Sequence, residues 1–163
     1  MAKWKERMTE TAPVPVRLAL GSTMLYHGTT KLTRQGIEAS VPFFEQVGIK
    51  PGRPWVIATG VTEALAGALL LGGIGTRLAA LGVLATQGVA IAKVHAKRGF
   101  AVEKQGFEFN LALCAIALGL FLRGPGRISV HDLARRKARA REIRHGKFLP
   151  KQRTVTRMLE MLA

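Results

Sequence analysis

The sequence predicts an all-α protein: an antiparallel bundle of four transmembrane helices at residues 1–128, followed by a basic helical tail at residues 129–163. Two observations predict this architecture. Apolar residues fall into blocks and charged residues fall between them, although only 48% of the residues are hydrophobic. The block Trp55–Gly73 contains a single charged residue, and at about 1.5 Å per helical residue it is long enough to cross the apolar core of a bilayer.

The order of the apolar blocks gives four spans, at about residues 14–32, 55–73, 77–95 and 107–122. The first span carries Arg17 near its start, and we expect this long side chain to reach the membrane interface. Pro54 and Trp55 are typical of a helix start and an interfacial anchor, respectively. Gly73 ends the second span and Gly75 keeps the next turn tight, so the second and third spans should be neighbours.

The second span also carries the most informative polar residue of the chain. Small residues recur every four positions at Gly60, Ala64, Ala68 and Gly72, a stripe that permits close helix approach in lipid. Glu63 lies beside this stripe, about 12 Å below the outer interface. A carboxylate at that depth is costly, so it usually faces a bundle interior and has a function there.

Polar side chains of several spans converge on the outer half of the predicted bundle. A cavity that opens outward would collect them and could bind a polar head group, a quinone ring, a proton or an ion. The alternative is a purely structural clasp between Glu63 and Lys93 or Arg17. No recognisable metal-ligand spacing is present, so no metal site is predicted. The candidate site residues are Glu63, Gln87, His95, His27 and Glu108.

The segment between the first two spans, residues 33–53, combines aromatic and acidic residues. Pro42 could open a short amphipathic helix that ends at Gly48. We expect such a helix to lie on the outer interface or dip into it, over the mouth of the bundle. An ordinary loop is the alternative.

The tail concentrates positive charge. The net charge is +15, and 12 of the 25 Lys and Arg residues lie from Arg123 onward. Ser129 or Asp132 could cap a helix that runs to about Arg144, and a second short helix is predicted at Thr154–Leu162. The tail suits anionic lipid or a protein partner, whereas the lack of interleaved aromatic residues argues against DNA or RNA. Its candidate contact residues are Arg135, Arg136, Lys137, Arg139, Arg141 and Arg144.

The distribution of charge predicts the orientation. The positive-inside rule puts the tail, and with four spans both termini, in the cytoplasm. Because Arg17 interrupts its apolar region, the first span is interpreted as uncleaved rather than as a signal peptide. A single cysteine, Cys114, excludes an internal disulfide or a CxxC pair and argues against a thiol–disulfide relay.

Several short motifs occur along the chain in a defined order: Arg17, Gly21, His27-Gly28-x-x-Lys31-Leu32, Phe43-Phe44, Gly48, Gly60-x-x-Glu63-x-x-x-Gly67, Gly73-x-x-Thr76-Arg77, His95, Gly99-Phe100, Glu108 and the run from Gly124 to Asp132. By their order and spacing, over roughly residues 13–132, they together resemble the DoxX family. The family's closing Ser-Leu-Asp has one more residue here, at Ser129–Asp132, and the tail is longer and more basic than the family pattern. The resemblance implies a small, multi-pass protein of a bacterial-type inner membrane with a redox link to the quinone pool, with Glu63 and the histidines near the site.

Three functions are consistent with these features. The first is a quinone-binding membrane subunit of an oxidoreductase, in which a redox partner supplies electrons, since the chain has no motif for haem, flavin or iron–sulfur clusters. The second is a non-catalytic assembly subunit of a larger membrane complex that docks through its basic tail. The third, a small transporter or proton channel, ranks last because the chain has no convincing internal repeat or broken helix. Whether the chain has an activity of its own stays open.

Overall fold

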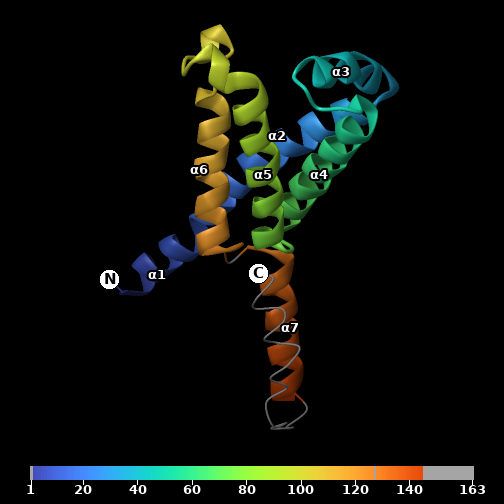
Figure 1. The fold of residues 1–163 in the computed structure, drawn as a ribbon. Helices are drawn as coiled ribbons and strands as arrows, with labels where there is room; N and C mark the ends of the chain where they lie inside the picture. Colours follow the sequence, from blue (N-terminus) through green and yellow to red (C-terminus); the bar gives the residue numbers. More distant parts are fainter. Residues whose placement is uncertain (1, 127, 145–163) are drawn as a thin grey trace.

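The structure, a computed structural model, describes residues 2–126 and 128–144. Every regular element in these ranges is helical, which confirms the predicted all-α class. In Figure 1, α5 and α6 stand side by side, α2 and α4 form a second, tilted pair, α3 lies across one end, and α1 and α7 extend from the other. The elements are α1 (Ala2–Thr11), α2 (Pro13–Leu32), α3 (Arg34–Gln46), α4 (Gly52–Gly72), α5 (Thr76–Ala90), the π-helical η1 (Ile91–His95), the 3₁₀ turns η2 (Ala96–Arg98) and η3 (Val102–Lys104), α6 (Glu108–Arg123) and α7 (Val130–Arg144).

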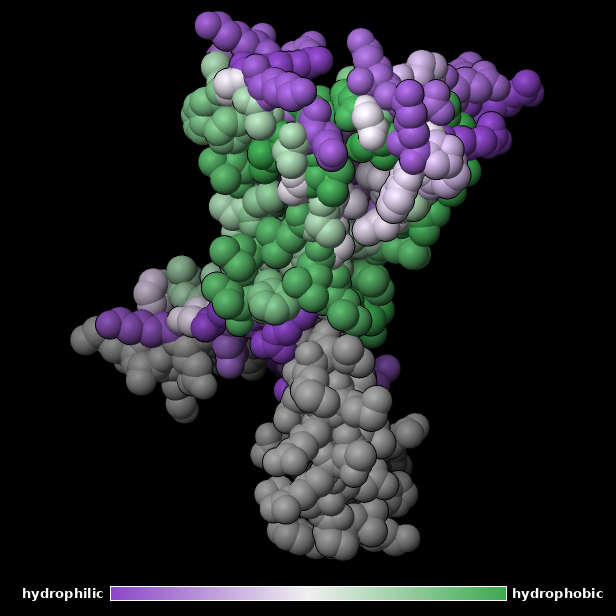
Figure 2. All heavy atoms as spheres, viewed as in Figure 1, coloured by the Kyte–Doolittle hydropathy of each residue, from purple (hydrophilic) through white to green (hydrophobic). Residues whose placement is uncertain are grey.

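Two helices within the described ranges are long and apolar enough to cross a membrane. They are α4 and the continuous helix Thr76–Arg98, which comprises α5, η1 and η2. The other two expected spans stay predictions: α2 has 20 residues but carries Arg17 and Lys31, and α6 has 16 residues. Figure 2 shows an apolar band between two hydrophilic ends, as expected for a membrane-facing surface.

Glycines bring α2 and α4 into direct backbone contact. A Cβ atom at Gly28 would lie 2.2 Å from the Ala64 nitrogen, and one at Gly67 would lie 2.4 Å from the Leu25 nitrogen. Gly21 and Gly60 lie in the same interface, opposite Gly67 and Gly28, so the two helices run antiparallel. Close approach of this kind lets helices pack by van der Waals contact where no hydrophobic driving force exists.

The packed stripe differs from the expected one. Gly60 and Ala64 do contact α2, but Ala68 is exposed and a Cβ atom at Gly72 would meet only the side chain of Ile74. The stripe continues through Gly67 instead. An α-helix has 3.6 residues per turn, so a strict four-residue repeat drifts off the contact face, whereas alternating steps of four and three stay on it.

The turn between α4 and α5 has the predicted form. Gly73 ends α4 with a φ of 65°, and Gly75 precedes α5 with a φ of 54°. These left-handed conformations favour glycine. The short connection places α4 beside α5, and the buried core lies between these helices, α2 and α6. The core comprises Leu20, Met24, Ala66, Leu70, Ala79, Ala80, Val83, Leu113, Ala117 and Leu120.

The helix expected from Pro42 to Gly48 begins earlier. Thr33 caps α3 by accepting a hydrogen bond from the Gly36 nitrogen, and Pro42 lies inside the helix. A proline in a helix lacks the N–H that would bond to the carbonyl four residues before it, but the helix continues to Gln46. The capping threonine, rather than the proline, therefore sets the start of α3.

Arg17 does not extend to the protein surface as a snorkelling side chain would; it is buried and held by the backbone at the end of the bundle. It is 3% exposed, and its guanidinium donates hydrogen bonds to the carbonyl oxygens of Pro125 and Ile128, each at 2.5 Å. The buried guanidinium thereby binds the linker 124–129, which joins α6 to α7. Burial is tolerated because carbonyl oxygens replace the water that a charged group loses.

The linker also packs against two other segments near the same end of the bundle. A Cβ atom at Gly126 would lie 2.7 Å from the Glu10 carbonyl oxygen, and one at Gly73 would lie 2.5 Å from the Cβ of Ser129. The Ser129 hydroxyl accepts a hydrogen bond from the Asp132 nitrogen, as predicted for the cap of α7. The helix is described as far as Arg144, and both its predicted end and the helix expected at Thr154–Leu162 concern residues outside the described ranges.

We expect Arg17→Met to destabilise the protein by about 3 kcal/mol, because a hydrogen bond from a charged donor contributes roughly 1.5–3 kcal/mol and two are lost. Thermal unfolding in detergent measures this change. Arg34→Met is the matched control, since Arg34 is 91% exposed and pairs only with Glu38 on its own helix. Equal melting temperatures for the two variants would contradict the assigned role of Arg17.

Candidate functional site

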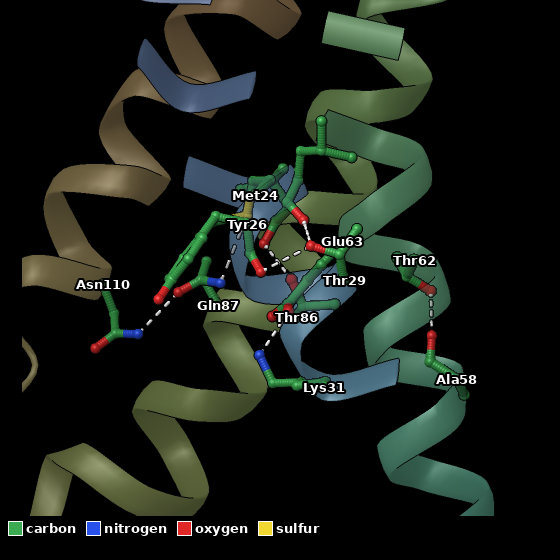
Figure 3. A network of polar contacts seen from close by, with 12 residues as sticks. Met24, Tyr26, Thr29, Lys31, Ala58, Thr62, Glu63, Thr86, Gln87 and Asn110 are labelled. Atoms are coloured by element: carbon green, nitrogen blue, oxygen red, sulfur yellow. Dashed lines mark hydrogen bonds and ion pairs between the residues drawn. The ribbon is translucent and has the colours of Figure 1, made fainter. Parts of the chain in front are cut away.

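An ion pair lies inside the bundle at the middle of α4. The Nζ of Lys31 is 2.5 Å from Oε2 of Glu63. The two side chains are 25% and 5% exposed, respectively, so the carboxylate is the more deeply buried partner. Figure 3 shows the pair joining α2 to α4. The predicted burial of Glu63 in the protein interior is confirmed.

The two charges meet because the helices run in opposite directions. Every Cα–Cβ bond of a helix tilts toward its own N-terminus. Lys31, in the last turn of α2, therefore leans back along α2, and Glu63 leans toward the start of α4. In an antiparallel pair these directions converge. The long lysine stem spans the remaining offset while its charged end stays on the carboxylate.

A second polar contact joins three helices. The Nδ2 of Asn110, from α6, donates a hydrogen bond of 2.8 Å to Oε1 of Gln87, from α5. The Nε2 of Gln87 donates to the thioether sulfur of Met24, from α2, at 3.9 Å. All three side chains are buried. Figure 3 shows both polar contacts in one region between the bundle helices.

The Gln87 amide has an unusual hydrogen-bond acceptor for a buried group. A primary amide carries two N–H donors, and a thioether is a weak acceptor. A buried donor gains most from a strong acceptor. The contact with Met24 is therefore a weak one for the Gln87 amide.

The remaining candidate residues lie elsewhere in the structure. The Nδ1 of His95 lies 2.7 Å from the Gln105 carbonyl oxygen, and Oε2 of Glu108 accepts a hydrogen bond from the Val102 nitrogen at 3.0 Å. Both contacts stabilise the connection between η1 and α6. His27 is exposed and makes an edge contact with Tyr26. The structure brings Gln87 and Glu63 into the bundle interior but places His27, His95 and Glu108 in other contacts.

Lys31 is the site residue that the sequence interpretation missed, since Lys93 and Arg17 were the cations weighed against Glu63. Glycines seven residues apart occur in both helices, Gly21 with Gly28 and Gly60 with Gly67. Matching these spacings in an antiparallel pair gives the register that the structure shows. That register puts Lys31 level with Ile57, about six residues before Glu63, and the long lysine side chain spans this offset.

The arrangement has a defined chemical capacity. Glu63 supplies a carboxylate and Lys31 an ammonium group, paired at 2.5 Å. Gln87 and Asn110 supply amide donors and acceptors that do not change charge. These polar groups lie inside a bundle whose outer surface carries an apolar band.

The comparison with known protein families gives one result. The DoxX family model matches residues 12–96, just over half of the chain, and the chain therefore belongs to the DoxX family. It is a membrane protein of that family. The searches of curated proteins and of solved structures gave no match.

The matched range contains most of the candidate site. It runs from the start of α2 through η1, so Lys31, Glu63 and Gln87 lie within it. Asn110 and the linker 124–129 lie beyond its end, although the sequence motifs suggested a resemblance as far as Asp132.

Proposed function

We propose that this DoxX-family protein is an inner-membrane subunit associated with a redox complex, and that it binds a quinone between α2, α4, α5 and α6. The observation that carries the proposal is the buried Gln87 amide, whose nitrogen donates to a thioether 3.9 Å away. A quinone carbonyl oxygen is a far better acceptor for that donor.

The residues around Gln87 fit a quinone. Its head group needs hydrogen-bond donors at its carbonyl oxygens, and Gln87 and Lys31 are donors on different helices. Its isoprenoid tail needs an apolar environment, which the band in Figure 2 offers. When bound, a quinone supplies two-electron, two-proton redox capacity, and the electrons come from a protein partner.

The chain's own residues would orient the quinone ring and exchange protons with it. In this proposal Gln87 and Asn110 orient the ring by hydrogen bonds, and Glu63, held in place by Lys31, is the carboxyl group that exchanges a proton with the quinone. His95, His27 and Glu108 belong to the outer, exchanging part of the proton path. This assignment keeps Glu63 in a functional role in addition to its structural pairing.

Bound quinone after purification from native membranes tests this function. Mild-detergent extraction followed by mass spectrometry of lipids should find quinone with the wild-type chain. Gln87→Leu should bind a short-chain ubiquinone about tenfold more weakly, the equivalent of one hydrogen bond of about 1.4 kcal/mol. Thr86→Val is the matched control, because the Thr86 hydroxyl bonds only to the backbone of its own helix. Unchanged affinity in Gln87→Leu would contradict the proposed site.

The position of α7 favours a second function, that of an assembly subunit. The helix projects away from the bundle, and Arg135, Arg136 and Lys137 are exposed on it (Figure 1). Arg139, Arg141 and Arg144 belong to the same helix, but their side chains lie outside the described residues. A basic helix held clear of the bundle suits an acidic protein surface or anionic lipid.

Deleting the chain after Asp132 separates the two functions. If the protein is an assembly subunit, the truncated chain should lose its co-purifying membrane partners and keep any bound quinone. Retention of all partners would contradict docking through the tail. The same proposal places four spans in the membrane and both termini in the cytoplasm, which cysteine labelling at Lys5→Cys and Lys50→Cys in a Cys114→Ala chain would check.

A further inference from the structure

Helix α3 has an apolar face that the protein covers only in part. Ile37, Val41 and Phe44 are spaced by four and three residues, so they share one side of the helix. Helix α3 contacts α4 and α2, but none of its residues is buried. The neighbouring Phe43 packs edge-on against Phe44 and is 36% exposed. Part of this apolar face is therefore not packed against any other described segment of the protein.

The position of α3 along the long axis of the bundle is fixed by its contacts with the first turn of α4. Oε1 of Glu45 accepts a hydrogen bond from the Gly52 nitrogen at 3.1 Å. A Cβ atom at Gly52 would lie 2.7 Å from the carbonyl oxygen of Val41. The missing side chain at Gly52 therefore lets the backbones of α3 and α4 touch. Helix α3 is held at the edge of the apolar stretch of α4, not beside its middle.

The direction of α3 differs from that of the bundle. In Figure 1, α5 and α6 run along the length of the bundle, whereas α3 lies across its end. The long apolar helices set the membrane normal. A helix at the end of such a span and across its direction lies near the plane of the membrane surface.

Residues around α3 are those that prefer a membrane interface. Trp55, one turn into α4, is 53% exposed, and tryptophan is enriched at the boundary between acyl chains and head groups. Lys50 and Arg53 are exposed beside it, where their charges can meet lipid phosphates. Exposed residues that suit a lipid interface therefore lie at the same end of α4 at which α3 is held.

We infer that α3 is an interfacial helix that inserts Phe43 and the uncovered edge of its apolar face into the head-group region of a phospholipid bilayer. The occupant of this face is lipid, because the face adjoins the lipid-exposed side of α4 and carries interfacial residues at its border. The inference goes beyond the proposed function, since it holds whether or not the bundle binds a quinone.

Depth-dependent fluorescence quenching tests this placement. The protein carries Trp4→Phe and Trp55→Phe, and Phe43→Trp supplies the single reporter. The full chain is reconstituted into phosphatidylcholine and phosphatidylglycerol vesicles brominated at carbons 6 and 7 or at carbons 11 and 12. We expect the shallow bromines to quench the reporter at least twofold more than the deep ones.

Two matched reporters define the scale. Leu65→Trp, at an exposed position near the middle of α4, should show the opposite order, and Gln35→Trp, on the exposed side of α3, should be quenched weakly. An unquenched reporter at position 43 beside a quenched one at position 65 would overturn the inference. Stronger deep than shallow quenching at position 43 would overturn it too.

A second label keeps the inference testable if tryptophan at position 43 prevents folding. A nitroxide on Phe43→Cys in a Cys114→Ala chain should be more accessible to oxygen than a label on Gln35→Cys, and less accessible to a nickel chelate. Equal accessibility at the two positions would contradict insertion. Neither measurement depends on bound quinone, so failure of this inference and failure of the proposed function are distinguishable.

Discussion

Gly28→Ala is expected to lower the free energy of unfolding by about 3 kcal/mol, the upper end of the usual cost of overpacking. The added methyl group would lie 2.2 Å from the Ala64 nitrogen and 2.7 Å from the Gly60 carbonyl oxygen. Both atoms are backbone of a neighbouring helix, so no side chain can move aside. The helices α2 and α4 would have to separate along their whole interface. Thermal unfolding in detergent should show a melting temperature lower by roughly 10 °C.

The matched control is Gly88→Ala on α5. A Cβ atom at Gly88 would meet nothing within 4 Å, and alanine is the stronger helix former by about 1 kcal/mol. We therefore expect an unchanged or slightly raised melting temperature. If the Gly28→Ala protein had the same melting temperature as the Gly88→Ala control, α2 and α4 would not be in backbone contact.

The Lys31–Glu63 pair should give unequal effects when its members are replaced singly. Lys31→Met leaves a carboxylate that is 5% exposed without its cation, and removing one partner of a buried ion pair costs about 3 kcal/mol or more. Glu63→Gln leaves the Lys31 ammonium, which is 25% exposed and can reach water, so the loss should be smaller. The double variant should recover more than half of the loss in Lys31→Met. A thermodynamic double-mutant cycle measures these changes in the free energy of unfolding.

The exposed pair Arg34–Glu38 is the control for this cycle. Its side chains are 91% and 61% exposed, and such pairs on one helix couple by about 0.2–0.5 kcal/mol. The buried pair should exceed this coupling several-fold. Additive effects of Lys31→Met and Glu63→Gln would show that the ion pair contributes nothing to the bundle.

Local signals predicted the helices well. The apolar blocks located α2, α4, α5 and α6 to within a few residues, and α7 begins where its predicted cap, Ser129, lies. Such boundaries depend on residues within one turn, on caps such as Ser129 and on glycines such as Gly73. The burial of Glu63 also followed from the chain alone, since a lone carboxylate in an apolar helix has few other places to lie.

Partners across helices were harder to predict. The cation that pairs with Glu63 depends on the register of α2 against α4, which glycine contacts set and hydropathy does not report. Arg17 binds carbonyl oxygens of residues 125 and 128, more than one hundred positions away in the chain. No pattern within the first span indicates those acceptors, so an interfacial position was the simpler expectation. The length of α3 was missed because Thr33, a modest local signal, outweighed the proline inside the helix.

The hydrogen bonds from Arg17 to the carbonyl oxygens of Pro125 and Ile128 have a consequence for the order in which the protein folds during synthesis. A ribosome delivers the arginine first and its acceptor carbonyls last, with a separation of 108 and 111 residues. Until the segment after α6 has been made, the guanidinium lacks these acceptors. We therefore expect α2 to complete its packing only after the last quarter of the chain has left the ribosome. Chains truncated before Pro125 should be less stable and more readily degraded.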